Sequence, residues 1–191
     1  MPRRKGTYIA AVKRGAPVEV SQDVSHQHEF NGTAALRRLF GDQRLEGLRS
    51  RWVLLRDEGE PLEEEHSLTW YDARERHPSR TEWRLYYDGD PSISADDLVV
   101  LIRREDHGDT TVLSAPAGSS WESQLLRLFG QPDPRSGSFV EARFEEVADE
   151  HLEIADQLFQ VLGWTDNPLE VEARHVALLV AKFGDRFPTT R

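Results

Sequence analysis

An arginine-rich segment between two aromatic stretches holds the residue types best suited to recognising another molecule. The segment 73–80 lies between 68–72 and 82–87. Arginine forks pair with guanine or phosphate, carboxylates accept from cytosine N4, and His or Ser can contact either partner. If the flanking stretches pair as strands, the segment projects as a rigid finger bearing Arg76, His77, Ser79, Arg80, Glu82 and Arg84. The alternative interpretation is a surface hairpin held by salt bridges.

A second candidate group lies earlier, at His26 and His28. Their alternation would place both imidazoles on one face of a strand, where they could bind a metal ion. No clear second cluster accompanies them, so a pair of polar loop residues is the competing interpretation. A stand-alone metal-dependent nuclease that uses these histidines and nearby acids stays open as an alternative function.

Other catalytic chemistry finds little support in the sequence. There is no Cys, which removes thiolate nucleophiles, disulfides and cysteine-based zinc sites. A nuclease of the PD-(D/E)xK kind needs a Lys close to two metal-binding carboxylates. The lysines are Lys5, Lys13 and Lys182, and none stands two residues after an acid. No HExxH, GxSxG, P-loop or GxGxxG pattern occurs, so we expect a non-catalytic chain that needs no cofactor.

The elements that position these residues are predicted to be mainly β with short helices, an α+β fold. Runs of apolar and aromatic residues indicate strands at 4–13, 52–55, 68–72, 82–87, 97–103 and 110–114. Helical spacing indicates helices at 34–40, capped by Asn31 or Thr33, and at 120–129, capped by Ser119 or Ser120. Loops or turns are expected at 15–27 and at the acidic stretch 59–65.

The last third of the chain has a different composition. The Pro- and Gly-containing stretch after residue 130 predicts a linker, which we place at 133–138 between a domain at 1–132 and a segment at 139–191. Amphipathic spacing predicts helices within 139–163 and at about 168–183.

Two segments together resemble a known DNA-binding domain. They are HQHEFNG at 26–32, followed by a helix ending in Leu-Phe-Gly, and WYDAR at 70–74 with SRTEWR at 79–84. The combination resembles the N-terminal effector-binding domain of EcoRII-type restriction endonucleases, over roughly residues 20–130. The resemblance implies a B3-like seven-stranded pseudobarrel followed by a small helical segment. Its N-arm, about 22–32, and C-arm, about 74–84, would grip the major groove of double-stranded DNA.

By position, this resemblance assigns DNA-contacting roles to both arms. The N-arm would supply His26, Gln27, His28 and Asn31, and the C-arm Arg74, Arg76, His77, Ser79, Arg80, Glu82, Trp83 and Arg84. Two departures remove donors, because Trp83 replaces a basic residue and Pro78 stands where a Lys is found in the family. Arg76, from the same loop, would compensate.

The resemblance also implies a biological setting. The chain would be the recognition or effector domain of a type II restriction endonuclease in the bacterial cytoplasm, monomeric, with 5′-CC(A/T)GG as its target. Its partners would be double-stranded DNA and its own nuclease domain, which would follow the helical segment and use Mg²⁺.

The charge distribution favours a different class of protein. The formal net charge is −10, with a net of +3 over residues 1–60, −7 over 61–144 and −6 over 145–191. An acidic protein-interaction domain or DNA mimic is therefore the main alternative. Of the 24 basic residues only three are Lys, so the basic groups are almost all forked donors. No apolar stretch is long enough for a transmembrane helix, and no membrane partner is expected.

Overall fold

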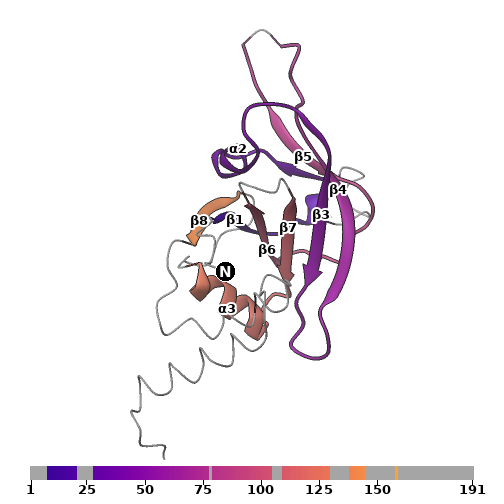
Figure 1. Cartoon of the computed structure of the whole chain (residues 1–191), viewed down its shortest axis with the longest axis vertical. Coiled ribbons are helices and arrows are strands. Elements are labelled where there is room, and N and C mark those ends of the chain that lie inside the picture. The colour runs from indigo at the N-terminus through magenta and orange to yellow at the C-terminus, as the bar shows by residue number, and fades with distance from the viewer. Residues whose placement is uncertain are drawn as a thin grey trace, which may run out of the picture. The chain divides into compact units, whose positions relative to one another are not determined.

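A computed structural model describes residues 8–20, 28–77, 79–104, 109–129, 138–144 and 158. The elements in chain order are β1 (Tyr8–Arg14), α1 (Pro17–Val20), β2 (Glu29–Asn31), α2 (Ala34–Phe40), β3 (Leu45–Leu54), β4 (Leu62–Asp72), β5 (Trp83–Tyr87), β6 (Leu98–Arg104), β7 (Thr110–Ala115), α3 (Ser120–Leu128) and β8 (Val140–Phe144) (Figure 1). The fold is mainly β with few helices, which confirms the predicted class.

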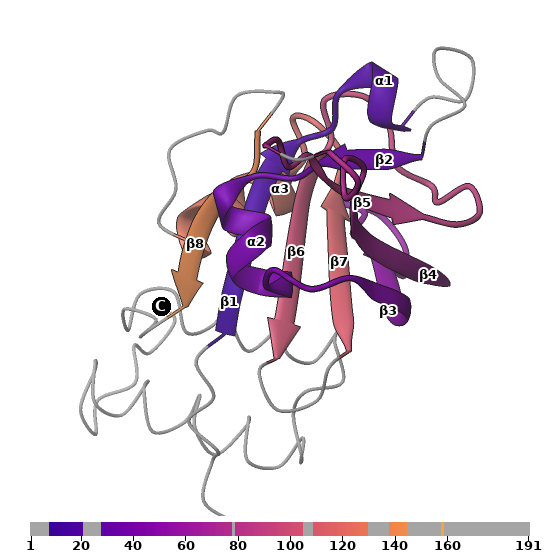
Figure 2. The ribbon, with the colours of Figure 1, turned by 90° about the horizontal axis from the view of Figure 1, so that it is seen from above.

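All eight of these strands belong to one mixed sheet. Its order is β2-β5-β4-β3-β7-β6-β1-β8, and every neighbouring pair is antiparallel except β3 and β7. The sheet is strongly curled, so that β2 and β5 run across the direction of β6 and β7 (Figure 2). The described residues thus contain eight strands, one more than the resemblance implies.

The core follows from the alternation of side chains along the strands. Phe30, Leu85 and Trp70 face one another across β2, β5 and β4, and all three are fully buried. Leu36 and Phe40 of α2 join the same cluster and cover it. The central strand β6 is apolar at every position from Leu98 to Ile102, as expected for a strand covered on both faces. Figure 2 shows α2 in front of these strands and α3 behind them.

Helix α2 is delimited by the residues that the sequence predicts. The Thr33 hydroxyl accepts a hydrogen bond from the Leu36 N–H at 3.4 Å, and Gly41 ends the helix with a positive φ of 81°. The Gly41 carbonyl accepts from the indole N–H of Trp70 at 3.0 Å. This bond fixes the end of the helix to the buried centre of the sheet.

One buried ion pair ties the N-terminal elements together. Lys13 of β1 and Glu19 of α1 are 1% and 4% exposed, and the Lys13 ammonium donates to Glu19 Oε1 at 2.6 Å. The ammonium also lies 5.7 Å from the ring centre of Phe30 and 5.2 Å from that of Phe139. The charge of Lys13 is therefore compensated by a carboxylate and two aromatic faces.

Two sequence predictions are wrong within the described residues. Residues 140–144, expected to begin a helix, form β8 and pair with β1, because the buried Ala142 lies directly opposite Ala10. The acidic stretch 63–65, expected as a turn, lies inside β4. There Glu63 pairs with Arg51 of β3, and Glu64 accepts from the backbone and hydroxyl of Ser92. Partners on neighbouring segments thus allow the carboxylates to occupy a strand.

The remaining expectations have mixed outcomes. The predicted strands of the first 115 residues are present with shifted ends, and residues 4–7 of the first one lie outside the described residues. Helix α2 has the predicted bounds, and α3 ends one residue earlier than predicted. Part of the expected loop 15–27 is the one-turn helix α1, and residues 21–27 lie outside the described residues. The chain forms two compact units, Met1–Glu146 and Val147–Arg191. In the second unit only the helical, buried Leu158 is described, so the helices predicted there lie outside the described residues. In the described part of the chain, no helix combines the length and apolar character needed to cross a bilayer.

Candidate functional site

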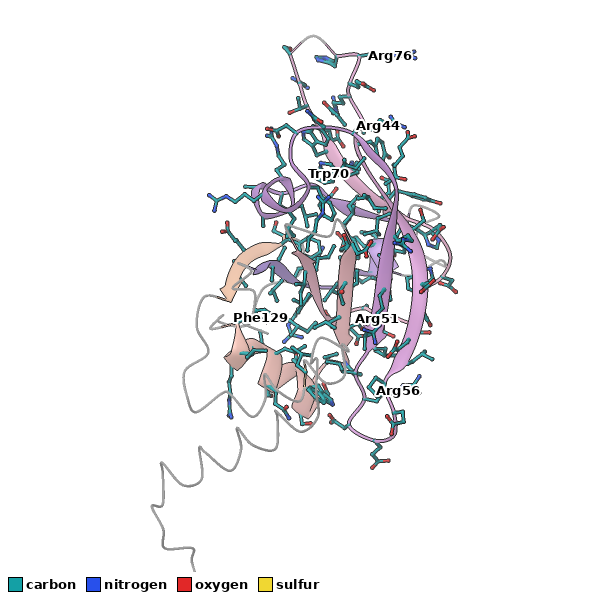
Figure 3. The ribbon with its side chains drawn as sticks, in the orientation of Figure 1. Arg44, Arg51, Arg56, Trp70, Arg76 and Phe129 are labelled. Carbon is teal, nitrogen blue, oxygen red and sulfur yellow. The ribbon has the colours of Figure 1, made fainter. Side chains whose placement is uncertain are left out.

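The segment 73–82, which we call the arginine loop, projects from the end of the β4–β5 ladder. That ladder ends at the pair Asp72 and Trp83, so the aromatic strands do form the predicted hairpin. The loop extends away from the sheet, and Arg76 lies near its outer end (Figure 3). Every described side chain from Ala73 to Thr81 is exposed.

The neck of this loop is fixed by Asp72. Its Oδ1 atom accepts from the backbone N–H of Arg74 at 2.9 Å and from that of Glu82 at 2.7 Å. The Ala73 N–H donates to the Glu82 carbonyl at 2.8 Å, which extends the ladder by one bond. The His77 N–H donates to the Arg74 carbonyl at 2.7 Å. The base of the loop is therefore ordered by its own polar groups.

Glu82 holds two arginines at this neck. Its carboxylate pairs with the guanidinium groups of Arg74 and Arg84 through separate oxygens. The hydrogen bonds from Arg84 and Arg74 hold the pKa of Glu82 below its usual value, and the bond to Glu82 raises the pKa of Arg84. The Glu82 carboxylate is thus ionised at neutral pH between two guanidinium groups, and each fork has a defined orientation.

Arg76 and Arg80 differ from these two arginines. Both side chains are exposed, and neither has an ion-pair partner among the residues that the structure describes. Between them, the Ser79 N–H donates to Nδ1 of His77 at 3.3 Å. Two ordered arginines, Arg74 in the loop and Arg84 in β5, therefore lie at the neck, and two unpaired ones lie farther out along the loop.

A row of side chains crosses the sheet beside the neck. Tyr71 of β4, Arg84 of β5 and Asn31 of β2 are direct cross-strand neighbours, and we call these three residues the outer row. They share the face opposite to the buried Trp70, Leu85 and Phe30. The pairing brings the end of the predicted N-arm, at Asn31, against the base of the predicted C-arm, at Arg84.

Glu29, two residues before Asn31 and on the same face of β2, organises this row. The Tyr71 hydroxyl donates to Glu29, and an Arg84 nitrogen lies 3.8 Å from a Glu29 oxygen. Burial, together with this hydrogen bond to a carboxylate, raises the pKa of Tyr71 to about 12. Tyr71 therefore stays a neutral donor at neutral pH.

Close backbone contact holds β2 against β5 at this point. The Gly32 N–H donates to the Trp83 carbonyl at 2.8 Å. A Cβ atom on residue 32 would lie 2.4 Å from that carbonyl oxygen and 2.5 Å from the Trp83 Cβ atom. Only glycine fits here without moving the strands, so Gly32 sets the spacing between Asn31 and Arg84.

Trp83 supports the loop from below. Its ring stacks on Trp70 with centroids 5.0 Å apart and an angle of 17°, and the Arg37 guanidinium lies 6.0 Å from the ring centre. The indole nitrogen of Trp83 is buried and has no hydrogen-bond partner among the residues that the structure describes. The structure thus places Trp83 in the scaffold, on the opposite face to Arg84, the next residue along β5.

The predicted N-arm is described only in part. His26 and Gln27 lie outside the described residues. His28 is half-buried, its ring packs edge-on against Tyr87 at 5.4 Å, and its carbonyl accepts from the Tyr87 N–H at 3.0 Å. Asn31 is exposed. The structure therefore joins Asn31, but not His28, to the surface around the arginine loop.

The structure adds residues that the sequence does not single out. Arg44, just before β3, lies 5.7 Å from the ring centre of Tyr71 and pairs with Glu46 at 2.6 Å. Arg37, in the last turn of α2, pairs with Asp42 with an Nε–Oδ1 distance of 2.8 Å. The pairing of β3 with β4 places Arg44 here, and the sequence contains no local signal for that pairing.

The surface formed by the arginine loop, the outer row and the adjoining Arg37 and Arg44 is charge-balanced rather than basic. Four of its arginines, Arg37, Arg44, Arg74 and Arg84, each have a carboxylate partner. Among the described residues, no group of three His, Asp or Glu side chains could hold a metal ion. No family model matches the chain, and no curated protein matches it either. A function is therefore inferred from the residues and geometry above.

Proposed function

We propose that the chain binds double-stranded DNA and reads its sequence through the arginine loop and the outer row. The observation that carries the proposal is the orientation of Arg74 and Arg84 by one carboxylate, directly beside the exposed Asn31. Base reading needs forked donors and acceptors in fixed positions, with Arg suited to guanine, Asn to adenine and a carboxylate to cytosine N4. This neck and the outer row beside it offer the forks of Arg74 and Arg84 and the Asn31 amide, and the Glu82 carboxylate holds the two forks in place.

The shape of the projecting element supports the same interpretation. The major groove of B-DNA admits an α-helix or a two-stranded β-ribbon. The ends of β4 and β5 with the arginine loop form such a ribbon, anchored by the buried pair Trp70 and Leu85. An insertion of this ribbon into the groove would bring Arg84 and Asn31 to the base edges.

The charge balance suggests how the contacts divide. Arg76 and Arg80 have no carboxylate partner in the described part of the chain, so Arg76 can contact a phosphate and Arg80 a guanine edge at no cost in broken ion pairs. The paired arginines keep their orientation and lose less freedom on binding. Non-specific attraction should be weak for such a neutral surface, and sequence-dependent contacts should carry most of the discrimination.

The biological role and detailed fold belong to the same proposal. The two arms resemble those of the EcoRII-type effector domain, and the β2–β5 and β4–β5 pairings that join them support a B3-like pseudobarrel. We therefore propose a recognition or effector domain of a restriction endonuclease, which would act with a Mg²⁺-dependent nuclease domain. The first duplex to test contains 5′-CC(A/T)GG.

The test is a binding titration by fluorescence anisotropy at one fixed salt concentration. The labelled duplexes carry CC(A/T)GG or a scrambled version of it, and further candidate sites come from selection on a random duplex library. Arg80→Ala and Arg84→Ala should each lose about 1–3 kcal/mol of specific binding. Arg76→Ala should weaken specific and scrambled duplexes alike and reduce the salt slope by about one.

Arg56→Ala is the matched control. Arg56 lies at the far end of the β3–β4 hairpin from Arg76 (Figure 3), and it is exposed. This variant loses the same charge and should keep wild-type affinity. Wild-type specificity in Arg84→Ala and Arg80→Ala, or the failure of wild-type protein to prefer any duplex, would overturn the proposal. The second result would favour the acidic protein-interaction domain.

A further inference from the structure

A polar pocket of about 390 Å³ opens at the foot of the arginine loop. Its walls come from the end of α2 and the turn after it, the residue before β3, and both sides of the β4–β5 hairpin. They include Arg37, Arg44, Asp72, Glu75, Thr81 and Trp83. The volume is within the range of small-molecule sites, and the arginines and Asn31 proposed to contact DNA are not among the lining residues.

One wall of the pocket is aromatic and fixed. Trp83 lines it with a ring that is stacked on the buried Trp70, whose indole N–H is bonded to the Gly41 carbonyl. The Arg37 guanidinium also lies over the Trp83 ring, 6.0 Å from its centre, so a planar ligand would lie against Trp83 by displacing this part-exposed side chain and would leave the core in place. Flat aromatic walls are the usual platform for unpaired bases.

The charge of the lining selects among ligands. It contains three carboxylates, on Asp42, Asp72 and Glu75, against the two guanidinium groups of Arg37 and Arg44. The net charge of the lining is therefore negative and would repel a phosphate group. A neutral ring with hydrogen-bond donors and acceptors would not be repelled.

Two of the lining groups are available for new hydrogen bonds. The Glu75 side chain is 72% exposed and its ion-pair contact is 3.9 Å long, to Arg44. Thr81 is exposed, and its hydroxyl has no hydrogen-bond partner among the described residues. Asp42 and Asp72, in contrast, already accept from Arg37 and from backbone N–H groups. The lining groups that can form new hydrogen bonds are therefore the Glu75 carboxylate, as an acceptor, and the Thr81 hydroxyl. The Arg44 guanidinium lies beside them in the lining.

We propose that this pocket takes one unpaired guanine base. Guanine has adjacent N–H donors at N1 and N2, which match the Glu75 carboxylate, and acceptors at O6 and N7, which match an arginine fork. The ring would lie against Trp83, and the Thr81 hydroxyl would contact its rim. If the base comes from a duplex, the inference rests on the proposed DNA binding. Extrusion of the base from the duplex would then place it beside the arginine loop, which would lie in the major groove. A free nucleoside is the other source.

The test has one arm for each source. In the first, nuclear magnetic resonance follows the Trp83 indole signal during titration with guanosine, with inosine as the ligand that lacks the N2 amino group. In the second, anisotropy compares a duplex carrying one bulged guanine with the same duplex fully paired. We expect guanosine to shift the indole signal more than inosine does, and the bulged duplex to bind on the order of tenfold tighter, since an unpaired base costs least to extrude.

Glu75→Gln and Thr81→Val are the test variants, and Glu60→Gln, on the exposed β3–β4 turn, matches the loss of charge. The ratio of bulged to paired affinity is compared within each variant. A guanosine response or bulge preference that Glu75→Gln or Thr81→Val reduces, and Glu60→Gln does not, supports the pocket. Guanosine binding without a bulge preference supports the free nucleoside as the source.

A bulge preference that neither variant changes, with no response to guanosine, overturns the inference, because flexible DNA alone would explain it. Absence of both effects overturns it as well. The two proposals fail separately. Paired-duplex binding that depends on Arg84, without either pocket effect, refutes only the base pocket. Guanosine binding without any duplex binding refutes only the proposed function.

Discussion

Gly32→Ala is the substitution that most directly tests the link between strand spacing and recognition. The new Cβ atom would lie 2.4 Å from the Trp83 carbonyl oxygen, 2.5 Å from its Cβ atom and 2.7 Å from its carbonyl carbon. Carbon atoms pack at about 3.5–4.0 Å, so β2 and β5 must separate by roughly 1 Å. The hydrogen bond from Gly32 to Trp83, now 2.8 Å long, would be stretched by the same movement.

The expected cost follows from these two effects. Overpacking of a tight contact costs about 1–3 kcal/mol, and a lost backbone hydrogen bond about 0.5–1.5 kcal/mol. We therefore expect the free energy of unfolding, measured by denaturant titration, to fall by roughly 2–4 kcal/mol. Specific DNA affinity, measured under conditions where the variant stays folded, should fall on the order of tenfold or more, because Asn31 moves away from Arg84.

Gly59→Ala provides the control. Gly59 has a φ of 81° and open space around its Cβ position, so this substitution costs only backbone strain of about 1–2 kcal/mol. It should leave DNA affinity unchanged. An unfolding midpoint for Gly32→Ala equal to that of the wild type would refute the tight approach of the two strands. Easier unfolding with undiminished specific affinity would show that the outer row is not part of the interface.

Two further predictions concern groups near the same strands. Glu19→Gln removes the carboxylate that pairs with the buried Lys13 ammonium, and it should lower the free energy of unfolding in denaturant titrations by about 3–5 kcal/mol. The double variant that also carries Lys13→Met should recover part of this loss. No recovery would show that the unpaired charge is not the cause. Tyr71 should ionise at about pH 12 when its ring signals are followed by nuclear magnetic resonance. Because this folded pKa lies above the unfolded value near 10, the stabilisation is present below pH 10 and is lost as the pH rises toward 12. Burial is the largest single cause of the raised pKa, so Glu29→Gln should lower the pKa only part of the way, and a full return to 10 would contradict this cause.

The sequence predicts those parts of the fold whose signals are local. Helix α2 has its cap at Thr33, its apolar spacing and its terminal glycine within nine residues. Strand β6 is a continuous apolar run, and the aromatic stretches around the arginine loop pair as predicted. In each case the residues that define the element are neighbours in the chain, so propensity and periodicity agree with the tertiary structure.

The rest depends on contacts between distant segments. Strand β2 has only three residues and exists through its pairing with β5, more than fifty positions later. Strand β8 has a weak pattern, and its Ala142 is buried against Ala10 at the other end of the unit. Glu82 is expected from the sequence to accept from a base, whereas its side chain holds Arg74 and Arg84 in the free protein. The orientation of side chains at an exposed loop depends on such pairings between segments. No periodic pattern in the sequence predicts it.

The position of β1 has a consequence for how the chain folds as it is made. Ile9 lies opposite Arg103 and Ala10 opposite Ala142, so the first strand has both of its neighbours near the far end of the unit. At synthesis rates of about 5–20 residues per second, this strand waits on the order of 10 s before β8 exists. During that interval its apolar edge is open to other chains. The yield of folded protein should therefore depend on how well β1 is shielded from other chains until β6 and β8 have been made.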